Sequence, residues 1–264
     1  MNQLETIAAF KRNEVADRKE LYPVKKLENS PLFDRKTISL TERILQKGSS
    51  GIIAEFKRKS PSKGMINSHS DVADVTRGYI RAGAAALSVL TDSHFFGGNN
   101  EDLSRAREVN DCPVLRKEFI VDQYQIIEAK SIGADAILLI AAILTPAETL
   151  NFATLARSLG MATILEIHGK EELEHLNDQI SILGVNNRNL ADFSVSLEIS
   201  LTLAPFITNG ITCISESGIR HPADVLILKQ AGYKGFLIGE QFMSTQDPAV
   251  ACETFIKQLN QPGT

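Results

Sequence analysis

The sequence has little of what marks secreted, metal-binding or membrane proteins. It contains three cysteines, Cys112, Cys213 and Cys252, which are widely spaced and odd in number. None has a metal-binding spacing such as C-x2-C, so we expect three reduced, mostly buried thiols in a cytoplasmic protein. No apolar run reaches the roughly 18 residues that a membrane helix needs. The first residues also lack the basic and apolar regions of a signal peptide, so we expect a soluble protein without a membrane partner.

An excess of charge of one sign is missing as well. The formal net charge is −4 and the pI is about 5.8, which leaves no basic field to hold nucleic acid. The composition, with 43% apolar and 23% charged residues, excludes a disordered chain. At 264 residues the chain can bury a large core, and its length is close to the roughly 250 residues of one (β/α)8 barrel.

Signatures of several enzyme classes are absent too. No dinucleotide-binding glycine motif follows a predicted strand, and no pairing of a nucleophile with a base is visible. The carboxylates that follow the predicted strands have no histidines nearby in metal-ligand spacing. His94 and His168 are isolated, and we interpret them as ordinary loop residues. We therefore expect neither a metal nor a cofactor.

What the sequence does have is a series of short apolar runs. Eight of them predict strands, at 51–54, 85–90, 113–115, 136–140, 162–165, 182–185, 211–214 and 235–238. The runs are continuous rather than alternating, as expected of parallel strands that are covered on both faces. Helix signals lie between them: a capping box from Thr145 to Glu148, prolines after His221 and Asp247, and glycines before the next strand at 83, 133, 160 and 232.

Residues 1–50 have a different pattern. Apolar residues are loosely spaced in charged segments, which predicts two or three amphipathic helices separated near Pro23 and Pro31. We expect a helical extension that packs on the main body. The whole chain, 1–264, is then a single domain with eight βα units over 51–264.

Five of the apolar runs end in charged or amide residues, and this pattern predicts the fold. A buried strand gains nothing from a terminal charge, so the repetition costs desolvation unless the strand ends meet at one polar site. The (β/α)8 or TIM barrel brings its strand ends to one mouth, where catalytic residues lie. We therefore predict an α/β protein with a TIM barrel and an N-terminal helical extension; a doubly wound open sheet is the alternative.

The candidate catalytic residues are two ammonium groups, several carboxylates and an amide. They are Glu55 and Lys57 after the first strand, Lys117 after the third, Glu166 after the fifth, Asn186 after the sixth and Glu216 after the seventh. This mixture suits proton transfer. A structural ion pair is the competing interpretation, above all for Glu55 with Lys57. Apolar neighbours before and after Lys117 favour a fixed, partly dry ammonium.

A second group of residues predicts a phosphate site. In TIM barrels the loops after strands 7 and 8 often bind phosphate, and here they contain Ser217 with Gly218 and Gly239 with Glu240. Glycine lets the backbone approach an anion closely, although each glycine alone also fits an ordinary turn. The segment 57–64 after the first strand adds four cations and two hydroxyls, which we expect at the same face.

These motifs together resemble one family, indole-3-glycerol-phosphate synthase. The similar segments are Ile52–Ser62, Ser88–Asp92 with Phe95–Gly98, Leu115–Ile120, Leu165–His168, Val185–Leu190 and Ser215–Ile219. They occur in order over nearly the whole chain. The resemblance implies ring closure of 1-(2-carboxyphenylamino)-1-deoxyribulose 5-phosphate to indole-3-glycerol phosphate with loss of carbon dioxide and water, in tryptophan biosynthesis. It also implies a phosphorylated small-molecule partner, and we expect a monomer or weak homodimer.

The resemblance assigns roles to the candidate residues. Lys117 is the implied general acid on the ribulose carbonyl, Glu166 takes part in proton transfer during dehydration, and Lys57 pairs with the substrate carboxylate. Glu55 and Glu216 position these groups. The implied substrate-binding residues are Asn186, Arg188, the phosphate-binding set Ser60, Ser217, Gly218, Gly239 and Glu240, and the aromatic-ring walls Phe96, Phe119 and Leu138.

Two other functions remain open. One is a related phosphate-binding TIM-barrel isomerase of the same pathway, which would need a cysteine or aspartate acid–base pair at strand ends 1 and 7. This chain has Glu55, Lys57 and Glu216 there. The other is a noncatalytic ligand-binding barrel, which predicts lost charges at the mouth, whereas the expected ones are present.

Overall fold

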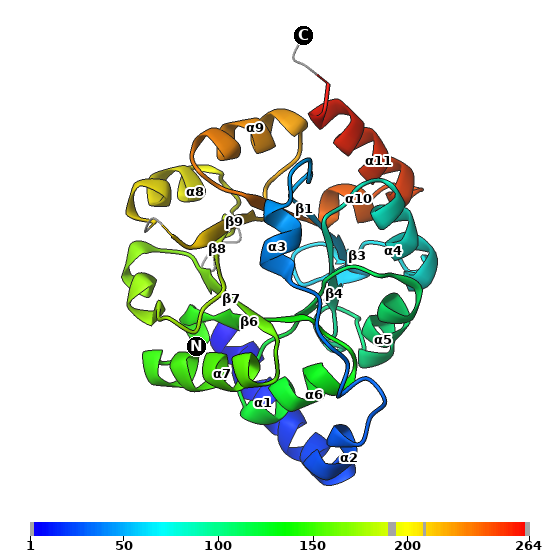
Figure 1. Ribbon diagram of the computed structural model, residues 1–264, viewed down its shortest axis with the longest axis vertical. Helices are drawn as coiled ribbons and strands as arrows, with labels where there is room; N and C mark the ends of the chain where they lie inside the picture. The colour runs from blue at the N-terminus through cyan, green and yellow to red at the C-terminus, as the bar shows by residue number, and fades with distance from the viewer. Residues whose placement is uncertain (1–2, 190–193, 208–209, 262–264) are drawn as a thin grey trace.

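Eight parallel strands close into a barrel in the computed structural model, which describes residues 3–189, 194–207 and 210–261 (Figure 1). Neighbouring strands follow chain order, and the last pairs with the first. The strands are β1 (Ile52–Phe56), β4 (Ala86–Leu90), β5 (Val114–Lys117), β6 (Ala136–Ile140), β7 (Ala162–Ile167), β8 (Ile182–Asn186), β9 (Thr212–Glu216) and β10 (Gly235–Ile238). The predicted TIM barrel is confirmed, and the open-sheet alternative is wrong.

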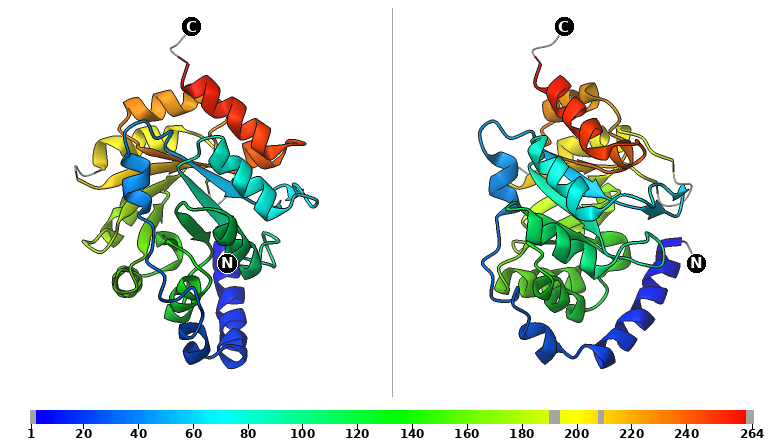
Figure 2. Two further views of the ribbon diagram at one scale, coloured as in Figure 1. Left: turned by 45° about the vertical axis from the view of Figure 1, so that its right-hand side comes forward. Right: turned by 90° about the vertical axis from the view of Figure 1, so that its right-hand side faces the viewer.

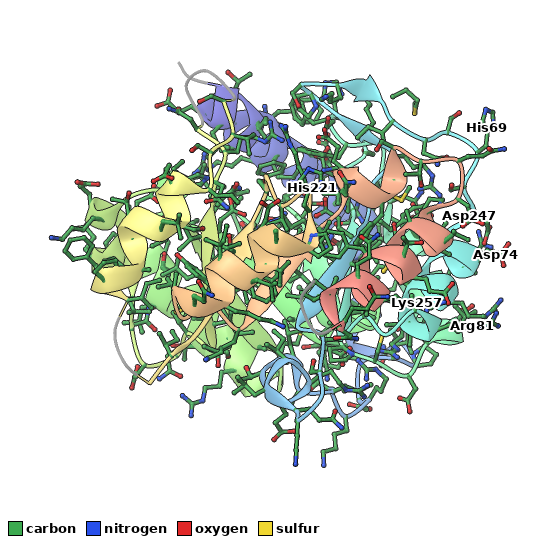
Figure 3. All side chains as sticks on the ribbon, turned by 90° about the horizontal axis from the view of Figure 1, so that it is seen from above. His69, Asp74, Arg81, His221, Asp247 and Lys257 are labelled. Carbon is green, nitrogen blue, oxygen red and sulfur yellow. The ribbon has the colours of Figure 1, made fainter. Side chains whose placement is uncertain are left out.

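Helices form an outer ring around the barrel (Figure 1). They are α4 (Val72–Arg81), α5 (Asn100–Val109), α6 (Gln123–Ser131), α7 (Pro146–Ser158), α8 (Glu198–Leu203), α9 (Pro222–Gln230), α10 (Glu240–Met243) and α11 (Pro248–Leu259), with 3-10 turns η1 (Ala141–Ile143), η2 (Lys170–His175) and η3 (Ala204–Phe206). The predicted capping box is confirmed, because the Thr145 hydroxyl accepts from the Glu148 N–H while the Glu148 carboxylate accepts from the Thr145 N–H. Charged residues such as Asp74 and Arg81 of α4 lie at the periphery (Figure 3).

The N-terminal segment is helical, as predicted, and its helices cover two different parts of the barrel. They are α1 (Gln3–Leu21), α2 (Val24–Glu28) and α3 (Leu40–Leu45). Leu40 and Ile44 of α3 join the apolar cluster inside the barrel, so α3 closes one end. The helix α1 runs along the outside, and its start lies at the opposite end, near the loop after β1 (Figure 2). This packing supports our proposal that residues 1–264 form a single domain.

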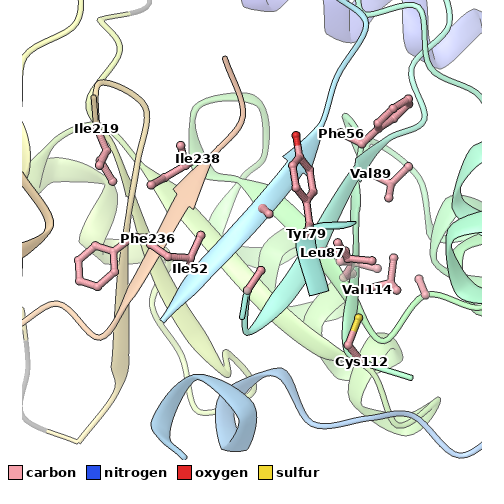
Figure 4. Close-up of a cluster of buried hydrophobic side chains, with 14 of the residues drawn as sticks. Ile52, Phe56, Tyr79, Leu87, Val89, Cys112, Val114, Ile219, Phe236 and Ile238 are labelled. Carbon is pink, nitrogen blue, oxygen red and sulfur yellow. The ribbon is translucent and has the colours of Figure 1, made fainter. Parts of the chain in front are cut away.

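Two apolar layers result from the alternation of side chains along each strand. Ile53, Leu115, Ile164 and Ile214 belong to the cluster inside the barrel. Their neighbours one position along the strand, such as Ile52, Val114 and Leu165, belong to the cluster between strands and helices. Figure 4 shows part of this outer cluster, with residues of β1, β4, β5 and β10 and the ring of Tyr79 from α4. The described helices include none long and apolar enough to cross a membrane.

The loop after β1 contains a feature that the sequence did not predict. Residues Lys59–Ser60 (β2) and Gly64–Met65 (β3) pair as a short antiparallel hairpin. Figures 2 and 3 place this hairpin at the same end of the molecule as the start of α1. Part of the charged segment 57–64 therefore forms regular structure beside the barrel mouth.

Candidate active site

The polar residues at the strand ends point into the barrel because of their register. Glu55 lies two positions after Ile53, Lys117 two after Leu115, and Glu166 two after Ile164. Glu216 follows Ile214 in the same way. Since side chains two apart share one face of a strand, these residues form the layer directly above the apolar interior. Their placement corrects the predicted strand ends: the charged residues belong to the strands themselves, which extend one to two residues beyond the apolar runs.

Lys117 lies at the centre of the barrel mouth, between two carboxylates. Its Nζ is 2.9 Å from Glu166 Oε2 and 2.5 Å from Glu216 Oε2, and it donates a hydrogen bond to each. Both carboxylates are at least 95% buried, and the lysine side chain is 16% exposed. The ammonium of Lys117 is therefore held in place and mostly shielded from solvent, as predicted. It lies at the same end of the barrel as the carboxylates of Glu166 and Glu216.

Burial and pairing shift the protonation equilibria of this cluster. Burial alone would lower the pKa of Lys117, but the facing carboxylates outweigh it and raise the pKa above its ordinary value. Burial would raise the pKa of Glu166, but the Lys117 ammonium lowers it to about 2. Burial raises the pKa of Glu216 to about 7, with the nearby Glu166 charge adding to the effect. At neutral pH the cluster therefore contains the Lys117 ammonium, the ionised Glu166 carboxylate and the Glu216 carboxyl group, whose pKa lies near neutrality.

Glu55, Lys57 and Asn186 are the remaining candidate catalytic residues, and they line the same pocket as Lys117. Lys57 Nζ lies 3.1 Å from Glu55 Oε1, so the expected ion pair exists. Asn186 donates its amide N–H to Glu166 Oε1 at 3.0 Å, while its amide oxygen accepts the backbone N–H of Arg188 at 3.0 Å. Asn186 thus orients the carboxylate of Glu166 and the start of the following loop at once.

His168 is a site residue that the sequence interpretation missed. Its Nε2 is 3.4 Å from Glu166 Oε1 and its Nδ1 is 3.5 Å from Glu172 Oε2. Burial would lower the pKa of His168, but the carboxylates of Glu172 and Glu166 outweigh it and raise the pKa. Its spacing two residues after Glu166 was the available signal, because strand β7 continues to Ile167.

Two adjoining pockets lie at the mouth, and together they are lined by all fifteen residues that the sequence singled out. Glu55, Lys57, Arg188 and Ser217 line both. The first pocket adds Lys117, Glu166, Asn186, Glu216, Ser60, Phe96, Phe119 and Leu138. The second adds Gly218, Gly239 and Glu240. Leu190, at the end of the similar segment Val185–Leu190, lies outside the described residues.

The second pocket has the backbone geometry expected of an anion site. Ser217 and Gly218 have successive positive φ angles of 66° and 78°, a region that non-glycine residues rarely adopt. A Cβ atom at Gly239 would lie 2.5 Å from Glu55 Oε1, so only glycine fits there. The Glu240 carboxylate faces Lys63 Nζ at 3.4 Å, which leaves its backbone as the group suited to an anion.

Some predicted cations of the 57–64 segment lie away from the pockets. Arg58 forms a bidentate ion pair with Asp102 of α5, and its guanidinium lies over the Phe56 ring. Lys59 donates to the backbone oxygen of His94. Ser60 of the hairpin lines the first pocket rather than the second. The segment lies at the expected face, but the side chains of Arg58 and Lys59 are paired elsewhere, and its contact with phosphate stays a prediction.

Apolar residues form one wall of the first pocket. The rings of Phe96 and Phe119 are 5.8 Å apart, and Leu138 adds to the barrel interior beneath them. Leu4 and Ile7 of α1 also line this pocket, which the sequence interpretation did not foresee. Within the described ranges, no group of three or more His, Cys, Asp or Glu residues could hold a metal ion.

Two solved structures with a similar fold are distant in sequence. The tryptophan synthase α subunit of Legionella pneumophila superposes with a TM-score of 0.60 at 14% identity, over 84% of this chain and 97% of that chain. The tryptophan synthase complex of Pyrococcus furiosus gives a TM-score of 0.59 at 14% identity, over 80% of this chain and 98% of that chain. These likenesses support the barrel fold alone.

Sequence relatives are much closer. A protein of Bacteroides thetaiotaomicron, named indole-3-glycerol phosphate synthase, is 43% identical over 97% of this chain and 98% of its own length. One of Laribacter hongkongensis with the same name is 44% identical over 94% of this chain and 96% of its own length. The family model of indole-3-glycerol phosphate synthase matches residues 4–255. The chain therefore belongs to the indole-3-glycerol phosphate synthase family.

Proposed function

We propose that this chain closes the indole ring of 1-(2-carboxyphenylamino)-1-deoxyribulose 5-phosphate. The products are indole-3-glycerol phosphate, carbon dioxide and water, so the chain is a decarboxylating lyase of tryptophan biosynthesis. The family membership supports this reaction. The main structural support for this proposal is the position of the Lys117 ammonium between Glu166 and Glu216. The pocket that contains it adjoins a second pocket suited to an anion.

Lys117 is the proposed general acid. As the aromatic carbon attacks the ribulose carbonyl, its oxygen gains negative charge, and an ammonium beside it can transfer a proton. The substrate nitrogen donates electrons into the ring, so the attack needs no separate electron sink. The carboxylates on either side of Lys117 hold its ammonium in place. The protein has to bend the substrate, protonate the oxygen and stabilise the resulting cation.

Glu166 and Lys57 are proposed to act in the later dehydration. Glu166 accepts a proton, and its low pKa means that it is a carboxylate rather than a neutral acid at neutral pH. Lys57, which Glu55 pairs with at 3.1 Å, binds the substrate carboxylate until carbon dioxide leaves and then donates a proton. Glu216 positions Lys117 from the other side. Asn186 positions Glu166 and binds substrate.

The two ends of the substrate fit the two pockets. Gly218, Gly239 and the backbone of Glu240 are proposed to bind the phosphate, together with Ser217 and Arg188 where the pockets meet. Ser60 contacts the substrate from the hairpin. The aromatic ring packs against Phe96, Phe119 and Leu138. Clamping both ends lets remote binding energy hold the folded geometry that ring closure requires.

A turnover assay tests this function. Purified protein is mixed with the carboxyphenylamino substrate, and indole fluorescence is followed together with release of carbon dioxide. We expect both products to appear in equal amounts. Isomerisation of a phosphorylated sugar without carbon dioxide release would favour the isomerase, and tight substrate binding without any product would favour the noncatalytic barrel.

We also propose a cytoplasmic location. Cys112, Cys213 and Cys252 are buried and unpaired, which fits a reducing compartment. The expected state of a monomer or weak homodimer stays a prediction, and light scattering across a range of concentrations tests it.

A further inference from the structure

Lys11 of α1 is a buried ammonium that the proposed reaction does not use. Only 1% of it is exposed. Its Nζ lies 2.8 Å from Asp92 Oδ2, 3.1 Å from Glu118 Oε1 and 2.9 Å from Glu14 Oε2. Asp92 and Glu118 are themselves buried and come from the loops after β4 and β5. A lysine is almost never fully buried unless it is paired, so these contacts define where α1 can lie.

Asp92 connects this ammonium to one aromatic wall of the first pocket. The Oδ1 atom of Asp92 accepts the backbone N–H of Phe95 at 2.6 Å and of Phe96 at 3.0 Å. The same carboxylate thus fixes the turn that presents Phe96 while its other oxygen faces Lys11. The adjacent Phe10 ring reinforces the contact, because it stacks on the His94 ring at 4.4 Å between centroids.

Glu118 connects the same ammonium to the other aromatic wall. Its Oε1 accepts the backbone N–H of Phe119 at 2.9 Å, and its Oε2 accepts the Thr91 hydroxyl at 2.9 Å. The backbone N–H of Thr91 in turn donates to the carbonyl of Lys117 at 3.1 Å. Arg116 faces Glu118 from the strand below, with NH2 4.0 Å from Oε2. Glu118 therefore holds the chain around the Phe119 ring.

The helix that carries Lys11 supplies a third part of this wall. Leu4 and Ile7 line the first pocket, and Ile7 is 4% exposed. Positions 4, 7 and 11 lie on one face of a helix, three and four residues apart. The face of α1 that Lys11 attaches to the loops is thus the face that borders the pocket, at the end of the barrel shown in Figure 2.

We propose that Lys11 is a positioning residue whose ammonium fastens α1, the Phe96 turn and the Phe119 segment into one wall for the aromatic ring of the substrate. This inference rests on the proposed function, since it names the part of the site that holds the ring. Among the described residues, the ion-pair partners of Lys11 are Glu14, Asp92 and Glu118, and none of these lines the second pocket, where the phosphate is proposed to bind. Loss of Lys11 therefore affects binding of the aromatic half and spares the phosphate half.

The test compares Lys11→Met with a matched control on the same helix. Methionine keeps the unbranched shape and most of the length of the lysine side chain and removes its ammonium group. The control is Lys19→Met, because Lys19 also joins α1 to the barrel, through Asp122 at 2.7 Å, but is exposed and lies far along α1 from the pocket. For each protein we measure kcat and KM with the carboxyphenylamino substrate, and the inhibition constant of inorganic phosphate.

We expect Lys11→Met to raise KM by roughly 10- to 100-fold, as displaced binding groups do, with a smaller fall in kcat. The phosphate inhibition constant and all constants of Lys19→Met stay at wild-type values. If Lys11→Met does not fold, Lys11→Gln replaces it, since its amide can still donate to one carboxylate, and the same pattern is expected with a smaller change.

Two results would overturn the inference. One is a wild-type KM in the folded Lys11 variant. The other is an equal loss of substrate and phosphate affinity, which would indicate a general structural role. If the wild-type protein formed no indole, the proposed function would fail on its own account. The inference would then be judged by calorimetric binding of the same substrate to the same three proteins.

Discussion

Arg188 is the cation whose removal most directly tests substrate binding. It lines both pockets, and its backbone is held by Asn186. A hydrogen bond to a charged group contributes about 1.5–3 kcal/mol, so we expect Arg188→Ala to raise the substrate Kd by roughly 10- to 100-fold. Titration calorimetry measures this value. Arg77→Ala on the outer helix α4 is the control and should bind normally. An unchanged Kd in Arg188→Ala would assign this residue to structure.

His168 gives the protein a pH-dependent contribution to stability. Its pKa is raised in the folded protein, so the folded state binds this proton more tightly than the unfolded state does. The contribution is fully present below the ordinary histidine pKa of about 6.5 and is lost as the pH rises through the folded value. We therefore expect the free energy of unfolding of the wild type to exceed that of His168→Gln most at pH 6, and less at pH 9.

Urea denaturation of both proteins at the two pH values measures this difference. His175→Gln is a suitable control, because His175 is also buried but contacts the Thr149 hydroxyl rather than a carboxylate. A stability difference for His168→Gln that grows towards pH 9 would contradict the assigned charge of His168.

Asp135, at the start of β6, joins three elements and shows how the N-terminal segment is attached. Its Oδ1 accepts from Arg35 at 2.6 Å and from the Ile38 N–H at 2.7 Å. Its Oδ2 accepts from Arg107 of α5 and from the Val114 N–H of β5, each at 2.9 Å. Removing one partner of a buried ion pair costs about 3–5 kcal/mol, so we expect Asp135→Asn to lose stability of that order.

Urea unfolding at pH 7 checks this value. Glu253→Gln is the matched control, because it breaks the exposed pair with Lys257 on α11 and should change stability by less than about 1 kcal/mol. Equal, small effects of the two substitutions would mean that Asp135 does not attach the segment 35–38 to the barrel.

The elements themselves were largely predictable from sequence. Continuous apolar runs indicated all eight barrel strands, and the glycines at the helix ends, such as Gly83 and Gly232 with φ of +99° and +107°, marked where the helices stop. The β2–β3 hairpin was not predictable, because it holds only two residue pairs and its sequence is a charged run. Lys59 also contacts the loop after β4, and the sequence of the segment does not indicate that contact.

Individual contacts at the site were less predictable than its position. The alternation of side chains along the strands is enough to bring Lys117, Glu166 and Glu216 together. Each lies two residues beyond an apolar residue of the barrel interior, so it points to the same side. The partners of Lys11 depend instead on how α1 packs on the barrel, and the contact of His168 with Glu172 depends on how η2 packs there. No local pattern carries that information. In the sequence, nothing therefore distinguishes Lys11 from the other charged residues of the N-terminal segment.

At the scale of the whole molecule, an occupied phosphate pocket should stabilise the fold. A ligand that binds only the folded state adds RT ln(1 + [L]/Kd), about 2.7 kcal/mol at 100 times Kd. We expect inorganic phosphate to raise Tm in a calorimetric scan, compared with chloride at equal ionic strength. The Arg188→Ala variant should show a smaller shift. Equal shifts with both salts would argue against a specific anion site between β9 and α10.

The proposed function requires that strand ends far apart in sequence meet around one substrate, with Lys117 as the proton donor. The most direct test is the kcat of Lys117→Met, measured by indole formation at saturating substrate. A general acid contributes roughly 10²- to 10⁴-fold, and we predict a fall in kcat of that size with the pocket otherwise intact. A variant that turns over at the wild-type rate would contradict the central claim.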